Sequence, residues 1–393
     1  MTETSSKSVL RLTTVMFLFV GLVGIWMGGC QTPEQKIEKL ISKLQPKNPK
    51  VRQTAVVALT KIGKDAVPVL IQALQDGSRG IRASAAGILG QIGAGAVDAS
   101  PALIKTLQNP DVRWHAEGAL VKIGKGAVPI LIQALQDPEV RQYATRVLAK
   151  IGEDAIDAVP ALIQTLQDPE EIVRVSAAKA LGSIGKDAKD AIPVLVQALQ
   201  DGVANVRSNA AEALAKIGKD AVPALVQLLQ DEVSNFRASA VWTLAKIGKD
   251  AVPALIQALQ DEDVQVRVSA AEVLGQIGSG AVDAMPALIQ VLRDQNPEVR
   301  QYAAGALGHI AAVDAVPALM QALKDQNPKV RNNAAWALEQ IGTPEAIKAA
   351  TSTCNSDSAG PIGIKIYWCL GFPSLFHFPV VEMLPVVSVG AML

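Results

Sequence analysis

The sequence is poor in aromatic residues, cysteine and histidine, and it has no surplus of charge of either sign. Aromatic residues make up 4% of the 393 residues although 49% are hydrophobic, so the core must be built from Ala, Val, Leu and Ile. Three cysteines exclude a fold stapled by several disulfides, and three histidines leave little room for a multi-histidine metal site. The balance of 37 basic and 37 acidic residues argues against a nucleic-acid-binding protein, and the hydrophobic content argues against disorder.

The first thirty residues have the organisation of a bacterial export signal. Lys7 and Arg11 precede an uncharged run over residues 13–29, whose apolar centre is short for a membrane-spanning helix. The run ends in Met-Gly-Gly before Cys30, and small residues before a cysteine resemble the lipobox of bacterial lipoproteins. That resemblance implies that Cys30 is lipidated and becomes the mature N-terminus of an exported protein, on the periplasmic or cell-surface side. The alternative is an uncleaved anchor helix, and both interpretations predict attachment to a membrane.

One motif occurs ten times between residues 31 and 342. Its core string, V-R-x-x-A-A-x-A-L-x-x-I-G, is seen at residues 206–218, and a second string, A-V-P-A-L-I-Q-A-L-Q-D, alternates with it. Both strings have helical apolar spacing, proline suits the first turn of the second, and glycine in a left-handed conformation ends the first. Each repeat of about 30 residues is therefore predicted to be two helices, A and B. Insertions fall between repeats, so we expect helix lengths to be held. The arginine of the B string recurs at Arg52, Arg82, Arg113, Arg141, Arg174, Arg207, Arg237, Arg267, Arg300 and Arg331.

These strings resemble the HEAT-repeat family, and in particular its short-period branch, the phycobilisome-lyase HEAT-like repeats. The resemblance covers about residues 34–342 and implies an all-α fold, a right-handed α-α superhelix (a solenoid) of about ten helix pairs. It also implies that the arginines form a structural ladder with an aspartate column, and that helix B lines the concave surface. The expected organisation is a signal or lipid-anchor segment at 1–30, the solenoid at 31–342, and an aborted helix with an apolar irregular tail at 343–393.

Columns that vary between repeats are free to serve function, and on helix B they lie one, two, five and nine residues after the arginine. Positions two, five and nine share one helix face. Five of the six aromatic residues of the repeat region occupy these columns, and aromatic and arginine side chains anchor protein interfaces. The alternative is that these side chains pack between neighbouring B helices. We predict that the concave face binds a protein or peptide through Trp114, His115, Tyr143, Arg146, Lys179, Trp242, Tyr302, His309 and Trp336.

Enzyme functions find little support in the sequence. Deoxyhypusine hydroxylases share this type of solenoid but carry His-Glu pairs as di-iron ligands, and this chain has no His-Glu dipeptide. Phycobilin lyases resemble the array in repeat length and in the A-L-x-x-I-G signature, so phycobilisome chromophore attachment is the alternative function. Gly-rich phosphate loops, G-x-S-x-G and C-x-x-C are missing from the sequence. We therefore predict no enzyme activity, no cofactor and no metal.

The last forty residues break the repeat pattern. The periodicity stops at Thr351, and from Pro361 onward the only charged residues are Lys365 and Glu382. A solenoid needs a polar cap on its last repeat, and the prolines of this segment exclude a membrane helix. Three interpretations stay open: a frameshifted end, a hydrophobic plug over the last repeat, and a partner-binding tail. Taken together, the sequence predicts a non-enzymatic, membrane-tethered scaffold that binds a protein or peptide and no nucleic acid.

Overall fold

Ten helix pairs follow one another along the chain. The computed structural model describes residues 32–45, 48–231 and 233–354, and all the regular secondary structure within these ranges is helical. The A helices are α2 (Pro33–Ser42), α4 (Val67–Ala73), α6 (Ser100–Thr106), α8 (Val128–Ala134), α10 (Val159–Thr165), α12 (Ile192–Ala198), α14 (Val222–Gln227), α16 (Val252–Ala258), α18 (Met285–Val291) and α20 (Val316–Ala322). The B helices are α3 (Pro49–Ile62), α5 (Arg79–Ile92), α7 (Arg113–Ile123), α9 (Arg141–Ile151), α11 (Glu171–Ile184), α13 (Ala204–Ile217), α15 (Ser234–Ile247), α17 (Val264–Ile277), α19 (Pro297–Ile310) and α21 (Pro328–Ile341). One more helix, α22 (Pro344–Cys354), follows the tenth pair.

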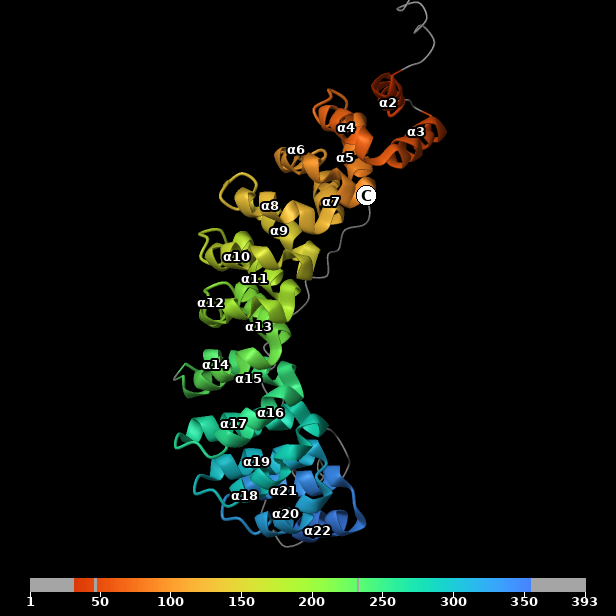
Figure 1. Ribbon diagram of the computed structural model, residues 1–393. Helices are drawn as coiled ribbons and strands as arrows, with labels where there is room; N and C mark the ends of the chain where they lie inside the picture. Colours follow the sequence, from red (N-terminus) through yellow and green to blue (C-terminus); the bar gives the residue numbers. More distant parts are fainter. Residues whose placement is uncertain (1–31, 46–47, 232, 355–393) are drawn as a thin grey trace, which may run out of the picture. The chain divides into compact units, whose positions relative to one another are not determined.

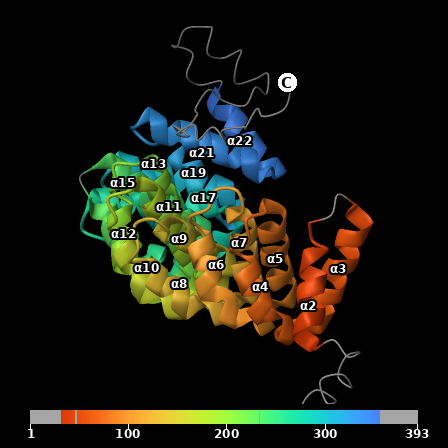
Figure 2. The same ribbon diagram turned by 90° about the horizontal axis from the view of Figure 1, so that it is seen from above.

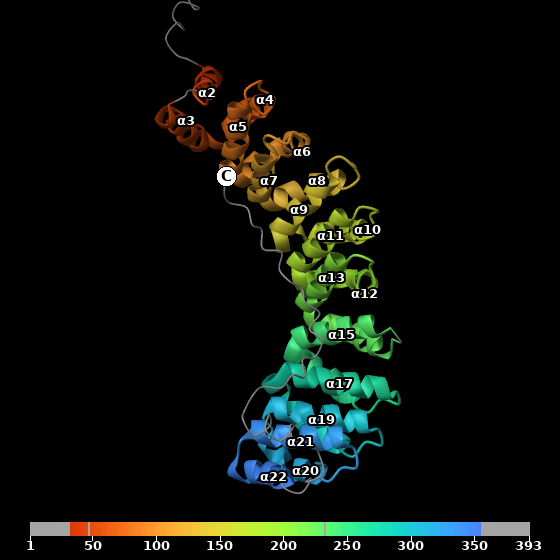
Figure 3. The same ribbon diagram turned by 180° about the vertical axis from the view of Figure 1, so that it is seen from behind.

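The helix pairs form two compact units, one ending at Ile277 and one beginning at Gly278. Within the first unit each B helix from α3 to α15 packs against the next B helix. Opposite views show α4, α6, α8, α10 and α12 in one row and α5, α7, α9, α11 and α13 in a second row beside it (Figures 1 and 3). The same two rows can be followed from above in Figure 2. In the second unit α19 packs on α21, and α22 packs on α20 and α21. The predicted all-α fold of repeated helix pairs is confirmed.

Proline and glycine set the limits of the helices as their chemistry requires. Nine A helices, α4 to α20, have proline at the first or second helical position, where the missing N–H group has no intrahelical partner. Glycine ends most B helices at positive φ, for example 82° at Gly218 and 71° at Gly342. The ψ of Gly218 is −136°, so the chain leaves this helix outside the left-handed helical region and enters a 3₁₀ turn, Gly218–Ala221. The recurring Gly-Lys-Asp sequences are therefore short connecting helices.

Insertions between repeats lengthen these 3₁₀ connections, as expected, but the B helices are not all of one length. The connection Gly93–Ala99 has seven residues where Gly63–Ala66 has four. Eight B helices have 14 residues, whereas α7 and α9 have 11 and begin at the repeat arginine itself, Arg113 or Arg141. These are the two repeats in which only 12 residues separate the proline of helix A from the arginine. The expectation that helix lengths are held was wrong here, because the missing residues come from the start of helix B.

Leucine and alanine columns make the core. The leucine seven residues after the arginine has no exposed surface in any B helix, from Leu59 to Leu338. The alanine three residues after the arginine is at most 1% exposed in all ten repeats, from Ala55 to Ala334. A methyl side chain lets neighbouring B helices approach closely, and the buried leucines supply most of the apolar area removed from water. This division explains how the chain forms a core with few aromatic residues.

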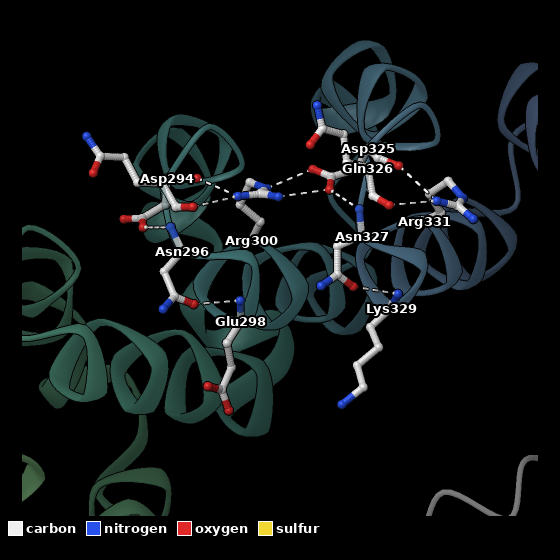
Figure 4. Close-up of polar contacts among 10 residues, drawn as sticks. Asp294, Asn296, Glu298, Arg300, Asp325, Gln326, Asn327, Lys329 and Arg331 are labelled. Atoms are coloured by element: carbon white, nitrogen blue, oxygen red, sulfur yellow. Dashed lines mark hydrogen bonds and ion pairs between the residues drawn. The ribbon is translucent and has the colours of Figure 1, made fainter.

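The arginine column builds a ladder of polar contacts beside this core. Seven arginines donate from Nη1 to the backbone oxygen of the aspartate six residues earlier; they are Arg82, Arg174, Arg207, Arg237, Arg267, Arg300 and Arg331. Several also bind a carboxylate of the next repeat, and Figure 4 shows Arg300 donating to both oxygens of Asp325 at 2.7 and 2.8 Å. Arg174 binds Asp201 in the same bidentate way at 2.8 and 3.1 Å. Asp325 in turn accepts from the backbone N–H of Asn327.

The Arg300–Asp325 contact predicts loss of stability in acid. Hydrogen bonding to Arg300 lowers the pKa of Asp325, so this pair stabilises the fold fully above the unfolded-state pKa of about 3.9. The stabilisation is lost as the pH falls through the lower pKa of the folded state. We expect Asp325→Asn to cost about 1–3 kcal/mol at pH 7, with the difference from wild type shrinking below about pH 4. Denaturant unfolding at several pH values measures this difference, and Asp314→Asn, at an exposed aspartate, is the control. A pH-independent difference would contradict the assignment.

None of the helices in the described ranges is long and apolar enough to cross a membrane. The predicted signal segment at 1–30, with Cys30, and the apolar tail beyond residue 354 lie outside these ranges. The helix expected to start near residue 343 is present as α22, which continues through Cys354.

Candidate protein-binding site

Three of the residues predicted to bind a partner come together between α7 and α9. Trp114 lies on α7, and Tyr143 and Arg146 lie on α9. The Arg146 guanidinium carbon is 5.4 Å from the Trp114 ring centroid and 5.3 Å from that of Tyr143. Two further cations complete the group: Arg113 lies 4.0 Å above the Tyr143 ring, and Lys150 Nζ lies 5.6 Å from Trp114. Such distances permit cation–π attraction. Together with the buried Glu117, these side chains form a group that we call the α7–α9 patch. Its members are Arg113, Trp114, Glu117, Tyr143, Arg146 and Lys150.

Glu117 is the buried base of the patch. Its side chain is 1% exposed, and it accepts from Arg146 through both carboxylate oxygens and from Lys150 Nζ at 3.4 Å. A buried carboxylate needs hydrogen-bond donors or an opposite charge in place of the water it has lost. Both partners come from the next repeat, so packing of α9 on α7 satisfies the charge. Glu117 therefore holds Arg146 and Lys150 beside the Trp114 ring.

Trp114 presents most of its surface to solvent even though two cations lie against it. It is 68% exposed, the largest fraction among the exposed large hydrophobic residues of the described chain. Tyr143 is half-buried, and the side chains of Arg146 and Lys150 are 36% and 45% exposed. The patch thus offers an open indole ring flanked by cations, a combination common at the centres of protein interfaces.

A second tryptophan lies on the B helices of the same unit. Trp242 on α15 is 41% exposed and has Lys246 Nζ 5.0 Å from its ring. Lys246 also pairs at 3.3 Å with Glu212 on α13, which pairs at 3.8 Å with Lys216. Here the carboxylate is 42% exposed, much like the two lysines, so both signs of charge face the solvent. This arrangement shares the indole–lysine contact of the α7–α9 patch but not its buried acid.

In the second unit, the ring of His309 on α19 packs against the ring of Trp336 on α21. Their ring centroids are 4.7 Å apart and the planes are inclined by 58°. Gly308 makes room for this contact, since a Cβ there would come within 2.6 Å of the Trp336 ring and 2.8 Å of the Ala337 Cα. His309 is still exposed, and the hydration that it loses lowers the pKa of its imidazole. Trp336 is half-buried, so this residue packs between neighbouring B helices, the alternative considered above.

The other predicted residues stand outside these groups. His115 and Lys179 are exposed on α7 and α11, and Tyr302 is half-buried on α19. A hollow between the turn that follows α10 and helix α12 is lined by Arg174 and Asp201, which bind each other in the ladder. Across the described ranges, no group of three or more His, Cys, Asp or Glu side chains is arranged to hold a metal ion.

The sequence profile of HEAT repeats matches residues 37–121, 128–215, 159–245, 222–288 and 285–370. The chain belongs to the HEAT-repeat family. Among solved structures, it is similar to Kap121p, with 16% identity over 92% of this chain and 45% of that one and a TM-score of 0.45. It is also similar to importin beta, with 17% identity over 82% of this chain and 53% of that one and a TM-score of 0.41. The chain spans about half the length of these two structures. No curated protein matches it in sequence.

Glu117 differs from the residues at the equivalent position of the other HEAT repeats, and this difference is visible in the sequence. It lies four residues after the arginine, where the other nine repeats carry Ala, Val or Thr. A single glutamate in an otherwise uncharged column indicates a local function or a dedicated charge partner. Lys150 has no such signal, because lysine also occupies its position, nine residues after the arginine, in four other HEAT repeats. Its role depends on the neighbouring helix.

Proposed function

We propose that this HEAT-repeat protein is a non-enzymatic scaffold that binds a protein or peptide along the B helices. The observation that carries the proposal is the exposure of Trp114 and Trp242. They are the only aromatic residues among the exposed large hydrophobic side chains of the described chain, and both lie on B helices of the first unit. Exposing an indole to water forgoes the free energy of its burial, and a bound partner recovers that free energy.

The contacts around the two indoles support the same proposal. Each has a lysine within cation–π distance, Lys150 for Trp114 and Lys246 for Trp242. A tryptophan beside a cation offers an apolar surface and a hydrogen-bond donor to the same ligand, which suits the mixed chemistry of a protein surface. Positions one and five after the arginine carry these tryptophans, so the columns that vary between repeats supply the binding groups.

The proposal includes attachment of the scaffold to a membrane through Cys30, and hence an exported, membrane-anchored bacterial protein. Its support is the sequence of residues 1–30, with two basic residues, an apolar run and small residues before the cysteine. The alternative of a phycobilin lyase rests on repeat length and signature alone. The match to HEAT repeats shows the family, and a fold family does not by itself determine a function, so function must be argued from the site. We therefore favour the scaffold.

Partner capture with and without the tryptophans tests the scaffold. We expect the full chain, purified from membranes, to retain a specific protein that Trp114→Ala/Trp242→Ala retains at least about tenfold less, because truncating interface anchors costs 2 kcal/mol or more. Helix content by circular dichroism should stay unchanged, since both indoles are exposed. In the same preparation, Cys30→Ser should move the protein out of the membrane fraction.

The matched control for capture is Val57→Ala, which truncates a 56% exposed side chain at the helix position that Trp242 occupies. This variant should retain the partner as wild type does. Equal retention by the tryptophan double variant would refute binding along the B helices. Loss of helix content in that variant would show instead that the indoles are structural.

A further inference from the structure

The α7–α9 patch faces outward with one sign of charge. Its only carboxylate, Glu117, is 1% exposed, while its partners Arg146 and Lys150 are 36% and 45% exposed. Two cations share this one buried anion, so solvent and ligands meet the cations first. Because the acid is held beneath them, a bound anion need not displace it in order to reach Arg146 and Lys150. The patch is therefore preorganised for a negatively charged group.

The excess of exposed positive charge is specific to the α7–α9 patch, because the ion pairs of Glu212 with lysines of α13 and α15 do not show it. There Glu212 is 42% exposed and neutralises Lys216 and Lys246 at the surface. An incoming anion at that place would meet a carboxylate as readily as an ammonium group. Among the described residues, two tryptophan–lysine contacts thus lie on B helices, and the buried acid distinguishes the one at α7–α9.

Helices on both sides of the patch extend the positive character. Apart from the ladder arginines, the B helices from α5 to α11 carry five basic residues and two acidic ones. From α13 to α17 the same count gives two basic and two acidic residues. Lys122 on α7 and Lys179 on α11 are both exposed. The surplus lies on helices that pack in sequence, α5 on α7, α7 on α9 and α9 on α11, so an extended segment crossing them would meet successive cations.

We propose that the α7–α9 patch binds an acidic peptide segment of the partner, with carboxylates on Arg146 and Lys150 and an adjacent apolar side chain on Trp114. This inference rests on the proposed scaffold function and specifies its ligand. The two cations lie 5.4 and 5.6 Å from the indole, so a carboxylate that they hold brings its neighbouring residue to the ring. The indole removes apolar surface from water, and the charges select the sign of the ligand.

Two synthetic peptides of equal length test the sign of the ligand against the full-length protein. One alternates Glu and Asp with Leu, and the other carries Gln and Asn at the same positions. By fluorescence anisotropy at low salt, we expect the acidic peptide to bind at least about tenfold more tightly, and the difference to shrink in high salt. Equal affinity of the two peptides, or binding of neither, would overturn the inference.

Variants then locate the binding. Lys150→Gln leaves Arg146 on Glu117 and should weaken the acidic peptide about three- to tenfold, and Trp114→Ala should weaken both peptides. Lys61→Gln is the matched control, an exposed lysine in the same column on α3, and should change nothing. Equal losses from Lys61→Gln and Lys150→Gln would indicate non-specific attraction and overturn the assignment to this patch. Single-stranded oligothymidylate that binds as tightly as the acidic peptide would do the same, in favour of a general polyanion site.

The experiments distinguish failure of the acidic-ligand inference from failure of the proposed scaffold function. If the captured partner depends on Trp114 and Trp242 but the acidic peptide fails to compete for it, the scaffold stands and the acidic-ligand inference fails. If capture does not depend on the tryptophans, the proposed function itself fails.

Discussion

Arg146→Ala is expected to destabilise the packing of α9 on α7 by about 2–4 kcal/mol. The substitution removes the donor that binds both oxygens of Glu117, a carboxylate with 1% of its side chain exposed. Lys150, at 3.4 Å from one oxygen, is then the only charged partner and cannot satisfy both. Hydrogen exchange followed by mass spectrometry should show that the amides of α7 and α9 exchange faster in the variant than in wild type. The amides of α13, which lies outside this contact, should exchange at the wild-type rate.

The expected loss of stability arises because Glu117 stays buried without its arginine partner. A second substitution tests this cause. Glu117→Ala alone should cost less than Arg146→Ala, because other repeats place alanine at this position and the released cations can reach water. The double variant Glu117→Ala/Arg146→Ala should recover most of the protection against exchange. If the double variant exchanges as fast as Arg146→Ala, lost packing of the arginine stem is the cause instead.

Gly308→Ala is expected to destabilise the second unit by about 1–3 kcal/mol. The new Cβ would lie 2.8 Å from the Cα of Ala337 and 2.6 Å from the Trp336 ring, so α19 and α21 must move apart. The backbone of Ala337 cannot turn away as a flexible side chain can. The free energy lost through the clash therefore exceeds the gain of about 1 kcal/mol that alanine brings to a helix interior. Denaturant unfolding followed by tryptophan fluorescence measures the change.

Gly305→Ala in the same helix is the matched control. Its Cβ would meet only the side-chain oxygen of Asn333, at 3.3 Å, which can turn away. This variant should be as stable as wild type or slightly more so, because glycine in a helix interior costs stability. A Gly308→Ala protein as stable as Gly305→Ala would contradict the close approach of α19 and α21.

The repeat pattern predicted most of the fold because the same core residues and the same helix-ending residues recur in each repeat. Leucine and alanine recur at fixed distances from the arginine, and all ten copies of each are buried. Proline and glycine mark where the helices begin and end, because one lacks a backbone donor and the other tolerates positive φ. The shortened starts of α7 and α9 were not predicted, although the two short proline-to-arginine distances were visible in the sequence.

Site prediction from the same columns was less complete. It selected Trp114, Tyr143 and Arg146, which the structure brings together, but also Trp336, which packs against Gly308 and His309. A helical period assigns a residue to a face, yet whether a large side chain on that face stays in solvent depends on the neighbouring helix. The glycine at position 308 opens space that a larger residue would fill, and Trp336 occupies it.

The sequence by itself determined the helix pairs, their order, the residues of the core and the HEAT-repeat family, because periodic spacing within one helix decides which side chains share a face. Only the tertiary structure decided that Glu117 is buried, that Arg146 and Lys150 neutralise it, and that Trp114 stays open beside them. These partners are 29 and 33 residues from Glu117 in the chain. The packing of α9 on α7 sets their distances, and spacing along a single helix carries no information about that packing.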